Sequence, residues 1–366
     1  MPSLSGGGAE RVMLNLAAGF ASCECDVDLV LASASGAYID QVDPRVTVVD
    51  LGARRVAASL PRLIRYLRRE RPAAMLVTHV HANVIALVAK SLSGVDVRLV
   101  VRDTESPVEA ARRRRTTWNS LIAILARRYY RYADAVVSVC LALREQIATA
   151  RSISSQKISV IYNPVRVDAL TALAAMPAGH AWLDNSDIRT ILAIGRLDEQ
   201  KDFESLIRAF GILRRDMDVK LVILGEGSRR SVLQKLIGTL GLENDVDLPG
   251  FAPNPYAFLG KADLFALSSL WEGLPNVLIE ALALGTPIVS TDCETGPREI
   301  LRNGRDGKLV PVADPAAMAV AMREALQNQT RRMPAAESLR RFEFLPVVHQ
   351  YLDLLLPQER LASINR

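Results

Sequence analysis

The sequence predicts an α/β protein with two domains, and three observations support this prediction. Short apolar runs rich in β-branched residues alternate with longer amphipathic runs, and the alternation restarts after residue 165. Strands that alternate with helices form parallel sheets that are covered on both faces. The 366 residues give each of two domains enough chain to bury its own core. We expect the junction at Tyr162-Asn163-Pro164-Val165, because the residue before a proline disfavours helix.

The individual elements follow from the periodicity of the apolar residues. In the first half, the expected strands are Val27–Leu31, Val46–Leu51, Ala74–Thr78, Arg98–Val101 and Ala135–Val139. The expected helices there are Ala9–Phe20, Val56–Arg69, Asn83–Leu92, Thr116–Tyr132 and Leu141–Thr149. In the second half, the expected strands are Thr190–Ile194, Lys220–Leu224, Val246–Leu248, Ala262–Leu267 and Pro287–Ser290. The helices expected with them are Phe203–Arg214, Ser228–Leu240, Val277–Leu284 and a helical tail from Ser338 to about Ser363.

The composition favours a protein that has no membrane span. Hydrophobic residues make up 49% of the chain, but they form no uninterrupted apolar run of about 18 residues. We expect no signal peptide, because the first residues contain a glycine cluster and an acidic residue instead of a basic segment. The four cysteines lack zinc-site or Cys-x-x-Cys spacing, which is typical of reduced cysteines in a cytoplasmic protein.

Arginine is unevenly distributed, although the net charge is only +5. The first cluster consists of Arg54, Arg55, Arg62, Arg65, Arg68, Arg69 and Arg71, and the second of Arg112 to Arg115, Arg127, Arg128 and Arg131. Two interpretations of these clusters stay open. They could be solvated helix faces, or they could attract anionic lipid headgroups or a pyrophosphate-linked lipid acceptor. Nucleic acid is not expected as a partner, because no aromatic residues interleave the basic runs.

Two carboxylates, Glu272 and Glu280, lie eight positions apart in a segment with a distinctive pattern. Pro275 prevents a helix before about residue 275, and the apolar run that follows is expected to be a buried helix that ends at Gly285. Glu280 would then be a charge on a mostly apolar helix, which requires a hydrogen-bonding partner such as a ribose diol or a sugar hydroxyl. The N-terminus of the same helix would attract a phosphate.

This segment resembles the Glu-x7-Glu signature of family 4 glycosyltransferases, which are retaining enzymes of the GT-B fold. Other segments resemble motifs of the same family in the same order, namely Ser5–Arg11, His81–Asn83, Ile194–Phe203, Val222–Gly227, Thr286–Thr291 and Gly296–Ile300. These motifs cover nearly the whole chain. Because they occur in the same order as in the family, the set as a whole is specific for that family. The resemblance implies two Rossmann-like domains facing a cleft, with a C-terminal helix that crosses back to the N-terminal domain.

On this basis we expect an acceptor-side domain over residues 1–163, a nucleotide-sugar-binding domain over 164–337 and a crossover helix over 338–366. The start of the chain departs from the family pattern, because only Met1-Pro2-Ser3-Leu4 precedes the Ser-Gly-Gly element, where relatives usually have an apolar strand. We therefore expect the first, central strand of the N-terminal sheet to be largely missing. Its two neighbours would then lack a partner, which would weaken the domain.

The resemblance also implies roles for individual residues. Arg196 and Lys201 would stabilise the leaving diphosphate, Glu280 would bind the nucleotide ribose, Glu272 would bind the donor sugar near its 3-hydroxyl, and His81 would contact the transferred hexose. The remaining contacts to the nucleotide-sugar are expected from Gly7, Gly8, Gly225, Gly227, Gly273, Leu274, Asn276 and Val277.

Each of these residues also has a purely structural interpretation. Arg196 and Lys201 could be a solvated loop pair, and Glu272 could be a carboxylate at a helix start. Glu280 could belong to a buried ion pair, and His81 could be a satisfied core histidine. His79 is the alternative to His81 if the register is shifted by two residues.

Together these inferences predict a metal-independent, retaining glycosyltransferase that moves a hexose or N-acetylhexosamine from a UDP- or GDP-sugar to an acceptor hydroxyl. The expected pathway class is polysaccharide, lipopolysaccharide or lipid-linked glycan synthesis. The expected location is the cytoplasm, with peripheral contact at the inner face of the cell membrane as an open alternative. The nucleotide-sugar is a co-substrate, so no cofactor and no metal are expected. Two alternatives stay open: a sugar-nucleotide 2-epimerase of the same fold, and a non-catalytic partner that binds a sugar nucleotide or a lipid.

Overall fold

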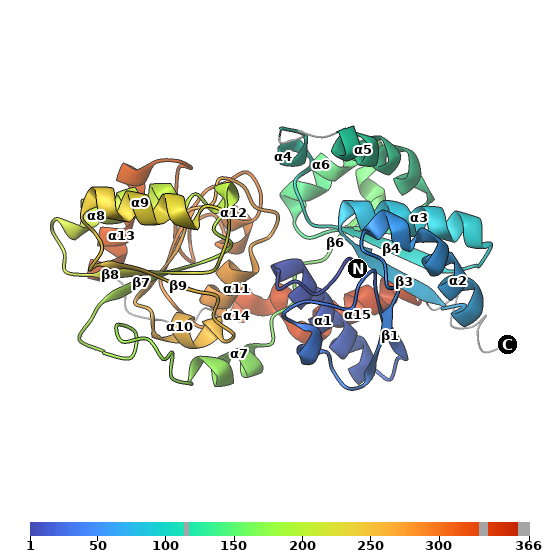
Figure 1. Cartoon of the computed structure of the whole chain (residues 1–366), viewed down its shortest axis with the longest axis horizontal. Helices are drawn as coiled ribbons and strands as arrows, with labels where there is room; N and C mark the ends of the chain where they lie inside the picture. Colours follow the sequence, from blue (N-terminus) through green and yellow to red (C-terminus); the bar gives the residue numbers. More distant parts are fainter. Residues whose placement is uncertain (113–116, 329–335, 358–366) are drawn as a thin grey trace. The chain divides into compact units, whose positions relative to one another are not determined.

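The computed structural model describes residues 1–112, 117–328 and 336–357, which form two compact units (Figure 1). Unit 1 combines Met1–Pro164 with the tail that begins at Phe344, and unit 2 comprises Val165–Glu343. Residues 338–343, expected in the crossover helix, belong to unit 2. The reason is that Phe342 is fully buried and its carbonyl accepts a hydrogen bond from the Val165 N–H at 2.8 Å.

The strands of unit 1 form two separate parallel sheets. The first sheet pairs β1 (Val27–Leu31) with β2 (Val46–Asp50). The second has the order β3 (Ala74–Thr78), β4 (Arg98–Asp103), β5 (Ala135–Ser138), β6 (Ile158–Val160). Among the described strands, β1 is hydrogen-bonded only to β2, and β3 only to β4. One edge of β1 and one edge of β3 are therefore not paired with a strand.

Helices cover both faces of these sheets (Figure 1). On one face, α1 (Gly8–Ser22) and α15 (Phe344–Leu355) pack together, with Leu16 and Tyr351 in a core that also contains Val100 and Val137. On the other face lie α2 (Leu60–Glu70), α3 (Val80–Ser93) and α5 (Thr117–Tyr129). The helix α6 (Leu141–Arg151) packs against β5 and β6, with α4 (Pro107–Arg112) beside it.

Unit 2 contains one parallel sheet of six strands. The strand order is β12 (Lys308–Val310), β11 (Ile288–Thr291), β10 (Leu264–Leu267), β7 (Thr190–Ile194), β8 (Lys220–Leu224), β9 (Val246–Gly250). One face carries α8 (Phe203–Arg214), α9 (Arg230–Leu240) and α13 (Pro315–Asn328), whose apolar residues form a shared core with the sheet. The other face carries α10 (Pro255–Lys261) and α11 (Asn276–Ala283), and α7 (Val167–Ala174) packs on α10. Two short helices, α12 (Pro297–Ile300) and α14 (Ala336–Leu339), complete the unit.

The predicted α/β class with parallel sheets is confirmed, and the differences from the prediction lie at the ends of elements and in several elements that were not predicted. The helix expected at Val56–Arg69 begins as a 3-10 turn, and α2 starts only at Leu60, because Pro61 fits only a first helical turn. The strand expected from Ala262 starts at Leu264, because Ala262 ends α10, which was not predicted. The tail helix begins at Phe344 instead of Ser338, and its expected end near Ser363 lies outside the described residues.

Candidate functional site

The candidate residues of unit 2 come to one edge of its sheet. Arg196 and Lys201 follow β7, Gly225 and Gly227 follow β8, and the segment with Glu272 follows β10. The strands β10, β7 and β8 are neighbours in the sheet and all are parallel. The carboxyl ends of parallel strands are where open α/β sheets bind ligands. Residues that lie far apart in the sequence are thus placed on one ligand-binding edge.

A buried ion pair joins two of these residues. Nζ of Lys201 lies 2.5 Å from Oε1 of Glu272, and the two side chains are only 14% and 7% exposed. The Ser269 hydroxyl donates a hydrogen bond to the same carboxylate oxygen at 2.7 Å. The Ser268 hydroxyl donates to the carbonyl of Lys201 at 2.6 Å. Because a buried charge is tolerated only with partners of this kind, both side chains have a fixed position.

The structural interpretations considered for these two residues do not apply. Glu272 precedes α11 by several residues, and the residue at the N-cap is Pro275, so Glu272 is not a helix-start carboxylate. Lys201 is not solvated, since it is buried against Glu272. Arg196, in contrast, has a side chain that is 74% exposed, and its nearest acid is Asp198 at 3.3 Å. Arg196 therefore reaches from the loop after β7 toward solvent.

Gln200 and Ser269 are site residues that the sequence interpretation missed. The Gln200 side-chain amide donates to the Trp271 carbonyl at 2.9 Å and lies 3.5 Å from the second Glu272 oxygen. Its amide oxygen lies 3.5 Å from the Arg196 guanidinium. Gln200 could have been predicted, because it lies between Arg196 and Lys201 in the sequence. Ser269 could be identified only from its contact with Glu272 in the structure.

Glu280 is half-buried on α11, the helix that was expected to be buried. The Tyr256 hydroxyl of α10 donates to its Oε1 at 3.2 Å. Leu278 and Ile279 on the same helix take the core positions, which directs Glu280 away from the core. The residue therefore keeps partial contact with solvent.

The two glycines after β8 have a clear structural role. Gly225 has a φ of 134°, and a Cβ atom there would lie 1.9 Å from the carbonyl oxygen of Gly195. A Cβ atom at Gly227 would lie 2.3 Å from the carbonyl oxygen of Leu197. Any side chain at either position would push apart the loops that follow β7 and β8. The glycines therefore allow these loops to touch and so help to fix the place of Arg196.

Unit 1 brings a second set of candidates together at the carboxyl end of β3 and the start of α1. Gly7 is the N-cap of α1, and Gly8 is its first residue. Glu10 in the first turn places Oε1 4.0 Å from Nε2 of His79. His79 follows β3 with a φ of 72°, and its ring stacks on that of His81 at 5.9 Å. Glu10 was not predicted, although an acid in the first turn after a glycine run is a detectable signal.

Both histidines are held neutral by their surroundings. Burial, with the neighbouring positive groups, lowers the pKa of His79 to about 4. Burial also lowers the pKa of His81 below its ordinary value. A neutral imidazole can both donate and accept a hydrogen bond, as a sugar hydroxyl requires. His79 and His81 lie side by side here, so the choice between them stays open.

Other polar residues near this edge have structural partners. Asn83 is fully buried, and its amide donates to the Arg102 carbonyl at 3.0 Å and to the Tyr130 hydroxyl at 2.9 Å. Arg102 is also fully buried, and its guanidinium contacts the Tyr351 hydroxyl of α15 at 3.0 Å and the Asn163 side chain at 2.5 Å. Arg102 therefore ties β4 to the C-terminal helix and to the residue that precedes the junction.

Within the described residues, most arginines of the two clusters lie on helices, whereas Arg54 and Arg55 precede α2. In the first cluster, Arg68 donates to the carbonyls of Leu92 and Ser93, and Arg62 to those of Leu51 and Gly52. In the second, residues 113–115 lie outside the described part of the chain, and Arg127, Arg128 and Arg131 are exposed. Within the described ranges, no helix combines the length and the apolar character that a membrane span requires. The same residues contain no group of three or more His, Cys, Asp or Glu side chains arranged to hold a metal ion.

Two family models match successive parts of the chain. The model of group 1 glycosyl transferases matches residues 181–342, which lie in unit 2. The model of glycosyltransferase family 4 matches residues 6–169, nearly all of which lie in unit 1. The Anabaena protein HepE, solved in complex with UDP-glucose, has a TM-score of 0.80 and 20% identity over 99% of this chain and 98% of its own. That likeness shows the GT-B fold.

Curated relatives support the same assignment. An uncharacterized glycosyltransferase of Methanocaldococcus jannaschii is 32% identical over 66% of this chain and 60% of its own length. A Campylobacter jejuni enzyme named as an N-acetylgalactosaminyltransferase acting on a diphospho-undecaprenol-linked sugar is 34% identical over 68% of this chain and 66% of its own length. The matches thus span just under two thirds of these relatives. The chain belongs to the family 4 glycosyltransferases of the GT-B fold.

Proposed function

We propose that this protein is a glycosyltransferase that moves a hexose or N-acetylhexosamine from a nucleotide-sugar to an acceptor hydroxyl. The buried Lys201–Glu272 pair at the carboxyl edge of unit 2 is the observation that carries the proposal. In this proposal, the Lys201 ammonium binds a phosphate of the donor, and the neighbouring Glu272 carboxylate binds a hydroxyl of the donor sugar. In this proposal, Glu280, which is half-buried on α11, binds the ribose with its carboxylate.

The proposed reaction breaks the bond between the anomeric carbon and the donor phosphate oxygen and forms one between that carbon and the acceptor oxygen. The acceptor proton passes to the departing phosphate oxygen, and the new bond forms on the face that the diphosphate leaves, so the configuration is retained. Lys201 and the exposed Arg196 offset the charge that develops on the diphosphate, which makes a metal ion unnecessary. Retention and metal independence rest on the resemblance of the Glu-x7-Glu segment.

The proposed acceptor is a lipid-linked glycan. The name of the Campylobacter jejuni relative gives a diphospho-undecaprenol-linked substrate. In this chain, α5 exposes Leu121 and Ile124 with 43% and 66% of their surface accessible. These two residues and Arg128 recur at intervals of three and four along the helix, so they share one face. An exposed apolar and basic face of this kind suits the interface of an anionic membrane, where such an acceptor is embedded.

The first test is a thermal-shift screen of the full chain with UDP- and GDP-sugars. A ligand that binds only the folded state raises the unfolding temperature. We expect one nucleotide class to give a shift, Glu280→Ala and Lys201→Met to abolish it, and Lys235→Met to leave it unchanged, because Lys235 is exposed on α9 of the same unit. No shift from any nucleotide-sugar with a folded chain would contradict the proposal.

The second test distinguishes the alternatives once a donor has been found. Incubation with the donor and with lipid-linked acceptors, followed by NMR of the product, reports the anomeric configuration. The same reaction in the presence of EDTA reports metal dependence. An inverted product or a loss of activity in EDTA would contradict those parts of the proposal. Release of a free epimerised sugar would identify a 2-epimerase, and binding without any turnover would identify a non-catalytic partner.

A further inference from the structure

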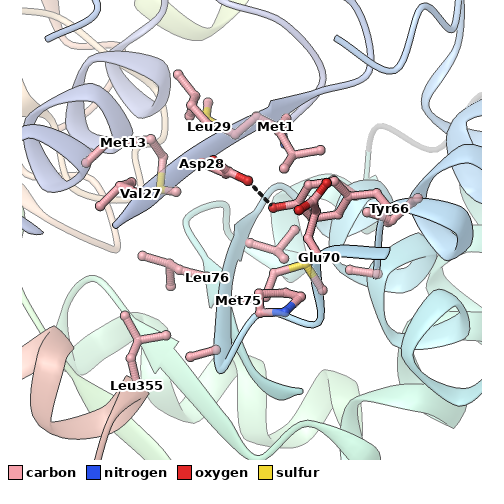
Figure 2. Close-up of a pocket in the computed structure, with 18 of the residues that line it drawn as sticks. Met1, Met13, Val27, Asp28, Leu29, Tyr66, Glu70, Met75, Leu76 and Leu355 are labelled. Atoms are coloured by element: carbon pink, nitrogen blue, oxygen red, sulfur yellow. Dashed lines mark hydrogen bonds between the residues drawn. The ribbon is translucent and has the colours of Figure 1, made fainter. Parts of the chain in front are cut away.

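The candidate site of unit 2 is built on closely packed loops, whereas unit 1 contains open space. In unit 1, a cavity of about 620 Å³ is lined by residues of β1 and β3, and Figure 2 shows apolar side chains of both strands around it. In unit 2, Gly296 has a φ of 94°, and a Cβ atom there would lie 2.7 Å from Cδ of Pro275 and 2.9 Å from the Gly273 carbonyl oxygen. Any side chain at this position would push these segments apart.

Two segments of unit 2 meet at this contact. The first comprises residues 268–275, which follow β10 and include Glu272, and we call it the glutamate loop. The second comprises residues 291–296, which are the last residue of β11 and the loop that leads into α12, and we call it the support segment. Because β10 and β11 are parallel neighbours, both segments leave the same edge of the sheet.

Side-chain hydroxyls of the support segment bind the backbone of the glutamate loop. The Thr291 hydroxyl donates to the Ser269 carbonyl at 2.6 Å, and the Thr295 hydroxyl donates to the Glu272 carbonyl. The two threonines are only 1% and 2% exposed. A hydrogen bond that is shielded from water is costly to break, since it leaves a buried polar group unsatisfied. Both ends of the turn from Ser269 to Glu272 are therefore held by the support segment.

The same turn places the carboxylate of the buried ion pair. Oε1 of Glu272 accepts from the Ser269 hydroxyl at 2.7 Å and lies 2.5 Å from Nζ of Lys201. Ser269 and Lys201 thus hold the side chain of Glu272, whereas the two threonines hold its main chain. The position of the carboxylate depends on both sets of contacts, because the main chain fixes where the side chain begins.

We propose that Thr291 and Thr295 are positioning residues that set the Glu272 carboxylate for its contacts with Lys201 and with a hydroxyl of the donor sugar. This inference rests on the roles given to Glu272 and Lys201 in the proposed function. A site must be held close to its productive geometry by the groups that surround it, and small displacements weaken its contacts with the ligand. The effect of the threonines is therefore expected on recognition of the sugar, through Glu272.

The first test needs no ligand. Urea unfolding of the chain, of Lys201→Met, of Glu272→Gln and of the double variant gives the coupling energy between these two side chains. We expect Thr295→Val to reduce this coupling by about half or more, and Thr295→Ser to retain it because serine keeps the hydroxyl. Thr291→Val takes the place of Thr295→Val if that chain does not fold. An unchanged coupling in the folded valine variant would overturn the proposal.

The matched control is Thr286→Val. Thr286 is 3% exposed, and its hydroxyl also donates to a backbone carbonyl, that of Leu259 at 2.9 Å. It precedes β11, so it lies at the opposite end of the same strand from the support segment. We expect Thr286→Val to lower the stability of unit 2 and to leave the coupling between Lys201 and Glu272 unchanged. Equal losses of coupling in the two valine variants would overturn the proposal, because they would show a general effect on the fold.

The second test measures recognition of the sugar. Calorimetry gives the ratio of the Kd for UDP to that for the UDP-sugar, or the same ratio for GDP and the GDP-sugar, according to the class that binds. We expect Thr295→Val and Glu272→Gln each to lower this ratio about tenfold, and the double variant to lower it no further, because both act through one carboxylate. Thr295→Ser and Thr286→Val should keep the ratio of the unmodified chain.

The outcomes distinguish this inference from the proposed function. A ratio that falls in Glu272→Gln but not in Thr295→Val would overturn the positioning role and leave the proposed function intact. A ratio that neither substitution changes would overturn the role of Glu272 in the proposed function, and the positioning role with it.

Discussion

At the scale of single residues, Lys201 and Glu272 depend on each other for stability. Removing Lys201 leaves a buried carboxylate without its cation, which typically costs about 3–5 kcal/mol. We expect Lys201→Met to lower the free energy of unfolding of unit 2 by about 3 kcal/mol and Glu272→Gln to restore most of this in the double variant. Urea unfolding of the four chains gives the coupling energy.

The control for this cycle is an exposed pair in the same unit. Lys308 and Glu324 contact one another with 38% and 48% of their side chains exposed. Because water screens such a pair, Lys308→Met is expected to cost no more than about 1 kcal/mol. Similar costs at the two lysines would show that the Lys201–Glu272 pair is not buried in solution.

Two basic groups make the stability of unit 1 sensitive to acid. Burial lowers the pKa of the Met1 amino group from 8.0 to about 6 and contributes most to lowering that of His79 from 6.5 to about 4. Between each pair of values the unfolded chain binds more protons than the folded chain, so stability falls as the pH falls. We expect the Met1 effect between pH 8 and 6 and the His79 effect between pH 6.5 and 4, each on the order of 3 kcal/mol.

The measurement is urea unfolding across this pH range, with hydrogen exchange at the Val100 amide to report unit 1. Acetylation of the Met1 amino group should remove the change in stability between pH 8 and 6. The His79→Gln substitution should remove the change between pH 6.5 and 4. A flat profile from pH 8 to 4 in the unmodified chain would show that neither group is buried.

The sequence predicted candidate residues for the site, but it did not predict the contacts between them. Lys201, Glu272 and Glu280 could each be identified from motifs and helix signals. The contact between Lys201 and Glu272 could not, because it joins residues 71 positions apart and depends on β7 and β10 being neighbours. The hydrogen bond between Glu280 and Tyr256 could not be predicted either, because Tyr256 lies on α10, a helix that the sequence pattern did not predict.

At the scale of elements, the apolar runs predicted the described strands that have four or more residues. The three-residue strands β6 and β12 were missed, because so short a run carries no periodicity. α13 was missed for a different reason, since its alanine-rich sequence has little contrast between its faces. The strands and helices that the sequence did not predict lie at the edges and on the faces of the sheets. The elements that carry the candidate site residues were predicted.

The exposed face of α5 leads to a prediction about membranes. Leu121 and Ile124 are exposed next to a basic stretch that contains Arg127 and Arg128. We expect the chain to bind vesicles that contain anionic lipid at low salt and to lose binding severalfold on Ile124→Asp, because both the apolar contact and the attraction to anionic lipid weaken. Co-sedimentation with vesicles measures this.

The matched control is Met176→Asp, which replaces an apolar residue that is exposed in unit 2. It introduces the same charge and should leave binding unchanged. Equal binding to neutral and anionic vesicles, or equal losses in the two variants, would count against a membrane contact through α5.

At the scale of the whole molecule, unit 1 is assembled from two parts of the chain that flank unit 2. Deleting the chain from Phe344 would expose core residues such as Leu16 and Val100 and remove the Tyr351 acceptor of the buried Arg102. We expect this truncation to abolish cooperative unfolding of unit 1 while unit 2 keeps its own transition and its response to a nucleotide-sugar. Calorimetry separates the two transitions.

Ending the chain after residue 357 is the control, because this leaves α15 intact. It should preserve both transitions. Loss of both transitions in the longer deletion would show that unit 2 also depends on the C-terminal helix.

The split of unit 1 also affects how the protein forms during synthesis. Its first part leaves the ribosome early, but α15, which covers part of its core, follows only after the 179 residues of unit 2. At typical elongation rates of about 5–20 residues per second, the delay is roughly 10–40 seconds. During this time the apolar surface that α15 later covers stays open to chaperones. Unit 1 contains the first residue of the chain, but it is the later of the two units to be completed.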